Sequence, residues 1–175
     1  MIDALIELAK ISREPLAPQP FDLSSAATSI FAELRARDPQ RRVQAIVQPG
    51  IVSRGDPVLL RLVLQNLIGN AWKFTSTRDE AKIVVDARPG DHGTIYRVCD
   101  NGVGFDMSFA DQIFGIFQRV HSQSLFPGTG IGLATTQRII RRHHGRIWAN
   151  AASDQGASFE FTLWDEVVNH PARLH

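Results

Sequence analysis

Four short segments, in this order, decide the fold of the chain: NLIGNAWKF (66–74), DNGVGF (100–105), IFGIF (113–117) and GTGIGL (128–133). The first continues a helical pattern, and the second follows directly on a strand-like run. The third lies in an irregular apolar stretch, and the fourth is a glycine-rich loop ahead of another helical pattern. Each segment alone is weak evidence, but together they predict one site built from a helix, a strand end and two glycine loops.

The helix that carries the first segment has a clear beginning. Asp56 precedes Pro57; an Asp side chain can cap free amide groups, and proline at the first helical position loses no hydrogen bond. Apolar residues then recur at helical spacing: Leu60, Val63, Leu64, Leu67, Ile68 and Ala71. The pattern predicts a helix that runs to about Phe74.

The flanking patterns complete an α/β arrangement. Helical spacing over 1–11 is followed by a proline-rich linker at 15–20, and Asp22 or Ser24 can cap the next helix, which ends before Asp38. The remaining expected elements are strands at 43–47, 51–53, 82–88, 94–100, 146–151 and 158–164, a five-residue hairpin loop PGDHG, and a helix at 132–144 stopped by Gly145. This order predicts a two-layer α/β sandwich, with a mixed, mostly antiparallel sheet and helices on one face.

Length and composition describe one globular domain. The chain has 175 residues, of which 43% are hydrophobic and 21% charged. We expect a helix tail and linker at 1–20, the domain itself at 21–165 and a tail at 166–175. A formal charge of +1 argues against nucleic-acid binding. A local basic cluster is expected to be a solvated helix end: Arg138, Arg141, Arg142, His143, His144 and Arg146.

Cysteine content and hydropathy bear on the environment. The lone Cys99 excludes a disulfide framework within the chain, and its apolar run predicts a buried core thiol. No apolar run reaches the length of a membrane span, and no signal-peptide pattern opens the chain. We therefore expect a soluble, cytoplasmic chain without membrane contact.

Asn66, Asn70 and Lys73 lie at i, i+4 and i+7 of the first segment, on a stripe separate from the apolar face. An amide oxygen can ligate Mg2+, and a lysine can place its charge on phosphate oxygens. A triplet of this kind in isolation is more often a polar helix face in water. Its meaning depends on the other segments.

The two glycine loops offer complementary chemistry. Asp100 ends a strand-like run, where a carboxylate can accept a hydrogen bond from an amine such as that of adenine, although Asp-Asn-Gly is equally good as a plain turn. The 128–133 loop can direct backbone amides and a helix N-terminus at an anion, or can be only a turn. The Walker pattern G-x4-G-K-[ST] is absent, and G-x-G-x-x-G fits neither loop. P-loop and Rossmann sites are therefore not supported.

The stretch 107–127 between these loops is long, apolar and irregular. A mobile lid over a bound ligand is the economical interpretation, and a satellite hydrophobic cluster is the alternative. Arg119 could reach phosphates when such a lid closes, or could be a surface residue.

In order and spacing, the four segments resemble the N, G1, F and G2 boxes of the ATP-binding catalytic domain of bacterial sensor histidine kinases, the HATPase or GHKL type. The stretch from 117 to 149 looks like kinases linked to phytochrome or PAS sensors. The resemblance covers roughly 21–164 and implies the histidine-kinase-like ATPase fold, with ATP and Mg2+ as ligands. Ile116, where many members have Pro, and His144, where Gly is common, depart from the family pattern.

The resemblance also implies a role for each matching residue. Asn70 would ligate Mg2+, Asn66 would position metal or phosphates, and Lys73 would contact phosphates, so that Asn66 and Lys73 count as catalytic. Asp100 would recognise the adenine amine. The remaining residues would shape the adenine pocket or hold phosphates: Gly102, Gly104, Gly128, Thr129, Gly130, Gly132 and Leu133.

The family's phosphoacceptor histidine, which precedes an acidic residue on a dimerisation helix, has no match among the histidines of this chain. We therefore expect the donor domain of a two-component kinase, a protein-histidine kinase whose acceptor lies in a dimerisation domain largely outside this chain. A response regulator would act downstream. The parent would be a homodimer, and this chain alone could be a monomer.

Two other functions stay open at this stage. An ATP-hydrolysing relative of gyrase or heat-shock chaperones would use a Glu at position 66 to activate water, and Asn66 cannot act as a general base. A non-catalytic, nucleotide-regulated interaction module is the second alternative. The intact segments argue against it, because such a module would be free to lose Asn70 or Asp100.

Overall fold

The computed structural model describes residues 15–118, 126 and 128–164. The helix expected at 1–11, Arg119 and the tail at 166–175 lie outside the described residues. The elements, in chain order, are β1 (Gln19–Asp22), α2 (Leu23–Arg37), β2 (Val43–Val47), β3 (Val52–Gly55), α3 (Pro57–Phe74), β4 (Ala81–Gly90), β5 (Gly93–Asp100), the 3-10 turn η1 (Met107–Phe109), α4 (Gly132–Arg142), β6 (Ile147–Ala152) and β7 (Gly156–Thr162).

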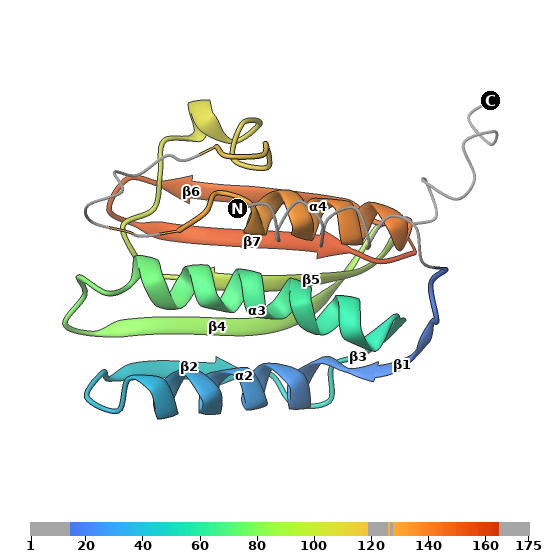
Figure 1. Cartoon of the computed structure of the whole chain (residues 1–175), viewed down its shortest axis with the longest axis horizontal. Helices are drawn as coiled ribbons and strands as arrows, with labels where there is room; N and C mark the ends of the chain where they lie inside the picture. The colour runs from blue at the N-terminus through green and yellow to red at the C-terminus, as the bar shows by residue number, and fades with distance from the viewer. Residues whose placement is uncertain (1–14, 119–125, 127, 165–175) are drawn as a thin grey trace.

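A five-stranded sheet forms one layer, with the strand order β2-β4-β5-β7-β6. The β2–β4 pair is parallel, and the other three pairs are antiparallel. Helices α2, α3 and α4 cover one face of this sheet (Figure 1). The prediction of a two-layer α/β sandwich with a mixed, mostly antiparallel sheet is confirmed.

Helix α3 has the N-terminal cap and the buried apolar face that its sequence predicts. The Asp56 side chain accepts hydrogen bonds from the amides of Val58 and Leu59 at 3.1 and 3.2 Å. The six apolar residues predicted for its inner face are all buried against the sheet and the other helices. Asp22, not Ser24, caps α2, since its carboxylate accepts from the amide of Ser25 at 2.8 Å.

The N-terminal strand and the β4–β5 hairpin differ from the prediction. Gln19 and Pro20, expected in a linker, belong to β1, which pairs antiparallel with β3 from Gln19–Gly55 to Asp22–Val52. The hairpin between β4 and β5 is tighter than the five-residue loop expected, because Gly90 pairs with Gly93 and leaves a two-residue connection. Both differences arise from pairing with a partner strand, which local propensity does not specify.

Helix α4 ends at Arg142, two residues before its predicted end. His144, not Gly145, takes the left-handed conformation after the helix, with φ of 52°. This is the position at which the kinases that the sequence resembles commonly have glycine. Gly145 has a separate constraint, because a Cβ there would lie 1.9 Å from the carbonyl oxygen of Thr162.

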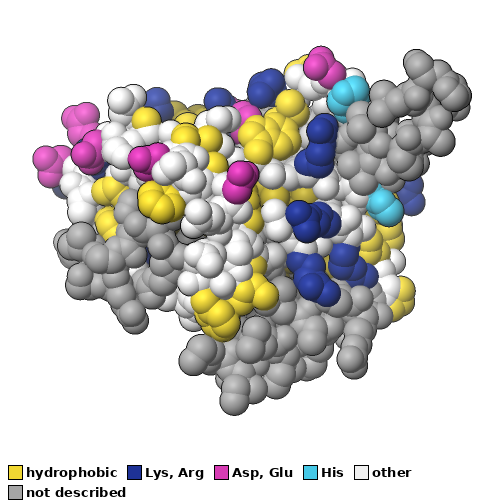
Figure 2. Space-filling view, turned by 90° about the horizontal axis from the view of Figure 1, so that it is seen from above, with side chains coloured by type: hydrophobic (Ala, Val, Ile, Leu, Met, Phe, Trp, Pro, Cys, Tyr) yellow, Lys and Arg dark blue, Asp and Glu magenta, His cyan; other side chains and the backbone are white. Residues whose placement is uncertain are grey.

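The basic cluster at the end of α4 divides into exposed and buried members. Arg138 and Arg141 are exposed as expected, whereas His143 is fully buried. Seen from above β6, Lys and Arg side chains gather towards one side of the surface and Asp and Glu towards the other (Figure 2).

Cys99 is half-buried rather than a core thiol. In the described part of the chain, no helix is both long and apolar enough to cross a membrane.

Candidate nucleotide-binding site

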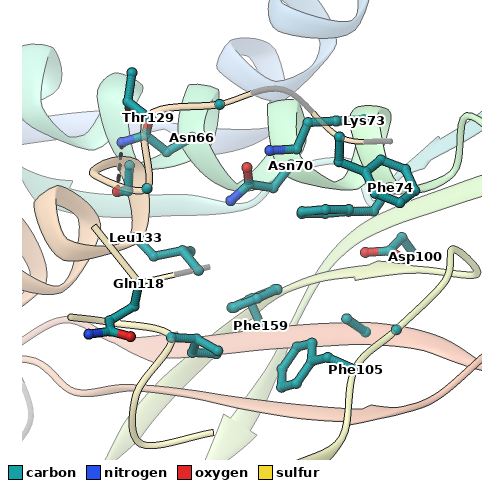
Figure 3. Close-up of a pocket in the computed structure, with 17 residues that line it drawn as sticks. Asn66, Asn70, Lys73, Phe74, Asp100, Phe105, Gln118, Thr129, Leu133 and Phe159 are labelled. Carbon is teal, nitrogen blue, oxygen red and sulfur yellow. Dashed lines mark hydrogen bonds between the residues drawn. The ribbon is translucent and has the colours of Figure 1, made fainter. Parts of the chain in front are cut away.

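A cavity of about 250 Å³ opens between α3, the start of α4 and the ends of β5 and β7. Figure 3 shows its labelled lining residues, with Asn70 and Lys73 pointing in from α3 and Asp100 at the far side. The lining comprises Asn66, Asn70, Lys73, Phe74, Asp100, Gly104, Phe105, Ile113, Gln118, Phe126, Gly128, Thr129, Gly130, Gly132, Leu133, Ala157 and Phe159. All four sequence segments therefore contribute to one cavity.

The polar stripe of α3 lies along one wall of the cavity. Asn66, Asn70 and Lys73 all line it, as their spacing predicts. The Asn66 amide group donates to the carbonyl oxygen of Gly132 at 3.1 Å and to the hydroxyl of Thr136 at 3.3 Å. Because a carbonyl only accepts, the amide nitrogen of Asn66 is the atom directed at the Gly132 carbonyl. Its Oδ1 also lies beside the start of α4, 3.3 Å from the position of a Cβ built on Gly132.

Lys73 lies between the helix and the second glycine loop. Its ammonium group is 4.4 Å from the centre of the Phe74 ring. A Cβ built on Gly128 would lie 3.1 Å from the same nitrogen, so the loop backbone passes close to it. The lysine charge therefore lies where the glycine loop meets α3.

The N-terminus of α4 faces the same end of the cavity. Ile131 precedes the helix and makes no side-chain capping hydrogen bond. Gly130, Gly132 and Leu133 line the cavity there. The backbone amides that begin a helix carry partial positive charge, which attracts an anion.

Asp100 occupies the opposite end, where β5 finishes. The residue is 7% exposed, and its Oδ1 accepts a hydrogen bond from the amide of Gly102 at 2.8 Å. Burial raises the pKa of Asp100 to about 6, although hydrogen bonds from the amides of Gly102 and Ala157 oppose the rise. The carboxylate is ionised at neutral pH but incompletely compensated by protein groups, so a donor from a ligand would be favourable there.

The two glycines of the first loop have different roles. The described lining includes Gly104 but not Gly102. Gly104 has φ of 59°, and a Cβ there would lie 2.0 Å from the carbonyl oxygen of Ala152. Gly102 abuts the carbonyl oxygen of Phe74, which a Cβ would approach to 2.4 Å. These glycines let the loop pack between the end of α3 and the β6–β7 turn.

Aromatic rings form the apolar walls beside Asp100. Phe105 and Phe159 lie 6.3 Å apart between ring centres, and Phe74 and Phe126 lie 5.1 Å apart. Flat apolar walls beside a single buried acceptor suit a heteroaromatic ring that carries an amine.

Seven residues of the cavity lining were not predicted from the sequence: Phe74, Phe105, Ile113, Gln118, Phe126, Ala157 and Phe159. Phe74, Phe105 and Ile113 lie inside the four quoted segments, so the motifs themselves could have indicated them. Gln118 and Phe126 belong to the stretch interpreted as a lid. Ala157 and Phe159 come from β7, and only the strand pairing with β5 brings them to the cavity.

Comparison with known proteins supports the same interpretation. Residues 55–167 match the family model described as histidine kinase-, DNA gyrase B-, and HSP90-like ATPase. The chain is 35% identical over 164 residues to cyanobacterial phytochrome A of Nostoc sp. (strain PCC 7120 / SAG 25.82 / UTEX 2576), covering 93% of this chain and 21% of the relative. It is 30% identical over 174 residues to the sensor protein kinase WalK of Staphylococcus aureus, covering 96% of this chain and 42% of that protein.

Solved structures share the fold. Full-length ShkA in complex with AMPPNP matches with a TM-score of 0.77 and 24% identity, over 94% of this chain and 35% of that one. The mycobacterial sensor histidine kinase MprB matches with a TM-score of 0.69 and 20% identity, over 84% of this chain and 97% of that one.

The chain thus spans about a fifth of the phytochrome relative and under half of WalK. The prediction of a histidine-kinase-type ATP-binding domain is confirmed by the family match over more than half of the chain. The chain belongs to the family of histidine kinase-, DNA gyrase B- and HSP90-like ATPases.

Proposed function

We propose that the domain binds Mg-ATP in the α3–α4 cavity and donates the γ-phosphate to a histidine of a dimerisation domain. The observation that carries the proposal is the polarity of the cavity. A buried carboxylate between aromatic walls lies at one end, and amides, an ammonium group and a glycine loop lie at the other. This arrangement suits a molecule with an amine-bearing ring and a polyanionic tail.

At the ring end, Asp100 would accept a hydrogen bond from the adenine amine. Its Oδ1 already accepts from the Gly102 amide, and a carboxylate has further lone pairs for a ligand. Phe105 and Phe159 would lie beside the ring. Gly102 and Gly104 would hold the loop that positions these groups.

At the anionic end, Lys73 and the amides around Gly128, Thr129, Gly130, Gly132 and Leu133 would hold the phosphates. A lysine acts as a point charge, and the start of α4 adds partial positive charge. Arg119, outside the described residues, is proposed as a further phosphate contact.

The metal would bind through Asn70. In the part of the chain that the structure describes, no cluster of three His, Cys, Asp or Glu residues could hold a metal ion. Mg2+ commonly takes only one or two protein ligands and completes its octahedron with substrate phosphates and water. The side-chain oxygen of Asn70 fits that donor set, and Asn66, fixed by Gly132 and Thr136, would position the same groups.

In phosphoryl transfer the protein mainly positions the reactants and neutralises charge. Asn66 and Lys73 would hold the donor in place while an imidazole nitrogen of the acceptor bonds to the γ-phosphorus and ADP leaves. The larger size of the relatives supports a dimerisation domain as partner. The proposal also includes a response regulator that acts downstream, a homodimeric full-length protein and a cytoplasmic location. Within this chain, it places a helix tail and linker at 1–20, the ATP-binding domain at 21–165 and a tail at 166–175.

The alternative of ATP hydrolysis depends on a base near the phosphates. Among the described residues of the cavity lining, the ionisable side chains are Lys73 and Asp100. Asp100 lies at the ring end, where it is committed to the Gly102 amide. The chemistry of this lining favours transfer to an external nucleophile over activation of water.

Nucleotide titration tests the binding step. We expect Asn70→Ala to abolish the gain in ATP affinity that Mg2+ gives, and Asp100→Ala to weaken binding with or without Mg2+. Asn150→Ala, an exposed amide on β6 outside the cavity lining, is the control and should bind as the parent does. Unchanged binding in both site variants would refute the site assignment.

A labelling experiment tests the transfer step. With γ-labelled ATP, the dimerisation domain of the full-length kinase should become labelled on histidine when this chain is present. The chain itself should stay unlabelled. Stable label on the chain, or steady ATP hydrolysis without acceptor, would contradict the proposal.

A further inference from the structure

Arg78, in the turn between α3 and β4, joins two loops at the ring end of the cavity although it does not line the cavity. Its guanidinium donates to the carbonyl oxygens of Asn101 at 3.0 Å, Gly102 at 2.9 Å and Asp154 at 2.7 Å. The first two belong to the loop after Asp100, and the third belongs to the β6–β7 turn. One side chain therefore ties the two loops together.

These bonds are to backbone carbonyls, so they depend on the fork of the guanidinium rather than on charge pairing. The carboxylate of Asp154 is 3.6 Å away and 85% exposed, whereas the Arg78 side chain is 30% exposed. A surface ion pair of this kind contributes little. The carbonyl contacts are the stronger part of the arrangement.

The Asn101 side chain anchors the same loop from the other side. It accepts from the amide of Lys82 at 2.8 Å and donates to the carbonyl oxygen of Glu80 at 2.8 Å. The loop is thus fixed to β4 by Asn101 and to the β6–β7 turn by Arg78. Contacts within the protein therefore hold the backbone of this loop in place.

The contact with Asn101 has a direct consequence for Asp100. The carbonyl of Asn101 and the amide of Gly102 belong to one planar peptide unit, so fixing one fixes the other. Arg78 holds the carbonyl side at 3.0 Å, and the amide side donates to Oδ1 of Asp100 at 2.8 Å. A donor on the carbonyl also polarises the peptide and strengthens the amide as a donor.

We propose that Arg78 is a positioning residue for base selection: by holding the peptide between Asn101 and Gly102, it orients the Asp100 carboxylate towards the amine of an adenine ring. This inference rests on the proposed function of the cavity. The selection is the preference for binding adenine over guanine, which carries a carbonyl where adenine carries its amine. An ionised carboxylate accepts a hydrogen bond from an amine, but a carbonyl has no hydrogen to donate to it.

The test measures ATP and GTP affinities of the chain and its variants by competition with a fluorescent ATP analogue. Arg78→Ala should lower the preference for ATP over GTP by about 3- to 10-fold, the range for loss of one oriented hydrogen bond. Arg78→Lys, which retains charge but not the fork, should fall between parent and Arg78→Ala. The lysine variant keeps the test valid if the alanine variant does not fold.

Two controls separate positioning from a general loss of stability. Arg61→Ala removes an ion pair with Glu33 on α2 from an arginine of similar exposure, 35%, and should leave the ATP/GTP ratio unchanged. Asp154→Asn removes the carboxylate and retains the backbone carbonyl, so it should also leave the ratio unchanged.

Three outcomes would overturn the proposal. If both Arg78 variants keep the ATP/GTP affinity ratio of the unsubstituted chain, the role of Arg78 is refuted but the proposed function of the cavity is not. The same holds if Arg61→Ala changes the ratio as much as the Arg78 variants do. Failure of the parent chain to bind ATP would refute the proposed function, and the inference with it.

Discussion

Replacing Asp100 by Asn should separate the stability of the domain from its recognition of the nucleotide. Asn retains an oxygen that can accept the hydrogen bond from the Gly102 amide, which is 2.8 Å from Oδ1 in the parent. It cannot ionise, and it presents an amide nitrogen where the second carboxylate oxygen was. The substitution therefore removes a buried charge and removes the acceptor for an adenine amine.

The expected effect on stability follows from the pKa. Burial raises the pKa of Asp100 from 3.8 to about 6, so the native state binds its proton more tightly than the unfolded state does. The contribution of the Asp100 carboxyl group to the free energy of unfolding is fully present below pH 3.8 and is lost as the pH rises through 6. At 1.36 kcal/mol per pKa unit, the cost of the ionised carboxylate is about 1 kcal/mol at pH 4.5 and about 3 kcal/mol at pH 7.5.

Urea denaturation of parent and Asp100→Asn at the two pH values measures this difference. The stability of the variant relative to the parent should rise by about 2 kcal/mol between pH 4.5 and pH 7.5. In the same samples, the loss of a hydrogen bond to a charged group should weaken ATP binding at pH 7.5 by at least about 10-fold. A relative stability independent of pH, or unchanged ATP affinity, would refute the reasoning.

Three further substitutions test other parts of the account. Gly104→Ala should destabilise the domain by about 2–4 kcal/mol in urea melts, because φ is 59° and the Cβ would meet a carbonyl oxygen at 2.0 Å. Gly50→Ala, with φ of 74° and nothing within 4 Å, should cost only about 1 kcal/mol; equal losses would contradict the packing argument. Burial lowers the pKa of His143 from 6.5, and its Nε2 accepts from the Asp56 amide at 2.9 Å. Its contribution is therefore present above pH 6.5 and lost as the pH falls. His143→Phe should cost about 1–3 kcal/mol at pH 7.5 and less at pH 5.5, whereas parallel pH profiles would exclude this role. Lys73→Met should weaken ATP binding about 10-fold but leave adenosine binding unchanged in calorimetry, and an equal loss for both would place Lys73 elsewhere.

Elements whose signals are local could be predicted from the sequence. The Asp56–Pro57 start of α3 needs only a capping carboxylate and a proline, and the structure has both in those roles. The stripe of Asn66, Asn70 and Lys73 follows from helical geometry alone, so its position on one cavity wall was also predictable.

Features that depend on distant pairing could not be predicted in this way. Strand β1 exists because it pairs with β3, which lies more than thirty positions later in the register Gln19–Gly55. The cavity wall of Ala157 and Phe159 depends on the pairing of β7 with β5. Arg78 carries no motif, and its significance arises only where the loops of β5 and β6 meet it.

A crystal structure of this chain with a non-hydrolysable ATP analogue and Mg2+ tests the central claim most directly. We expect the adenine amine within hydrogen-bonding distance of the Asp100 carboxylate, and the triphosphate at Lys73 and the 128–132 loop, with the metal on Asn70. An analogue bound outside this cavity, or bound with its phosphates at Asp100, would contradict the account.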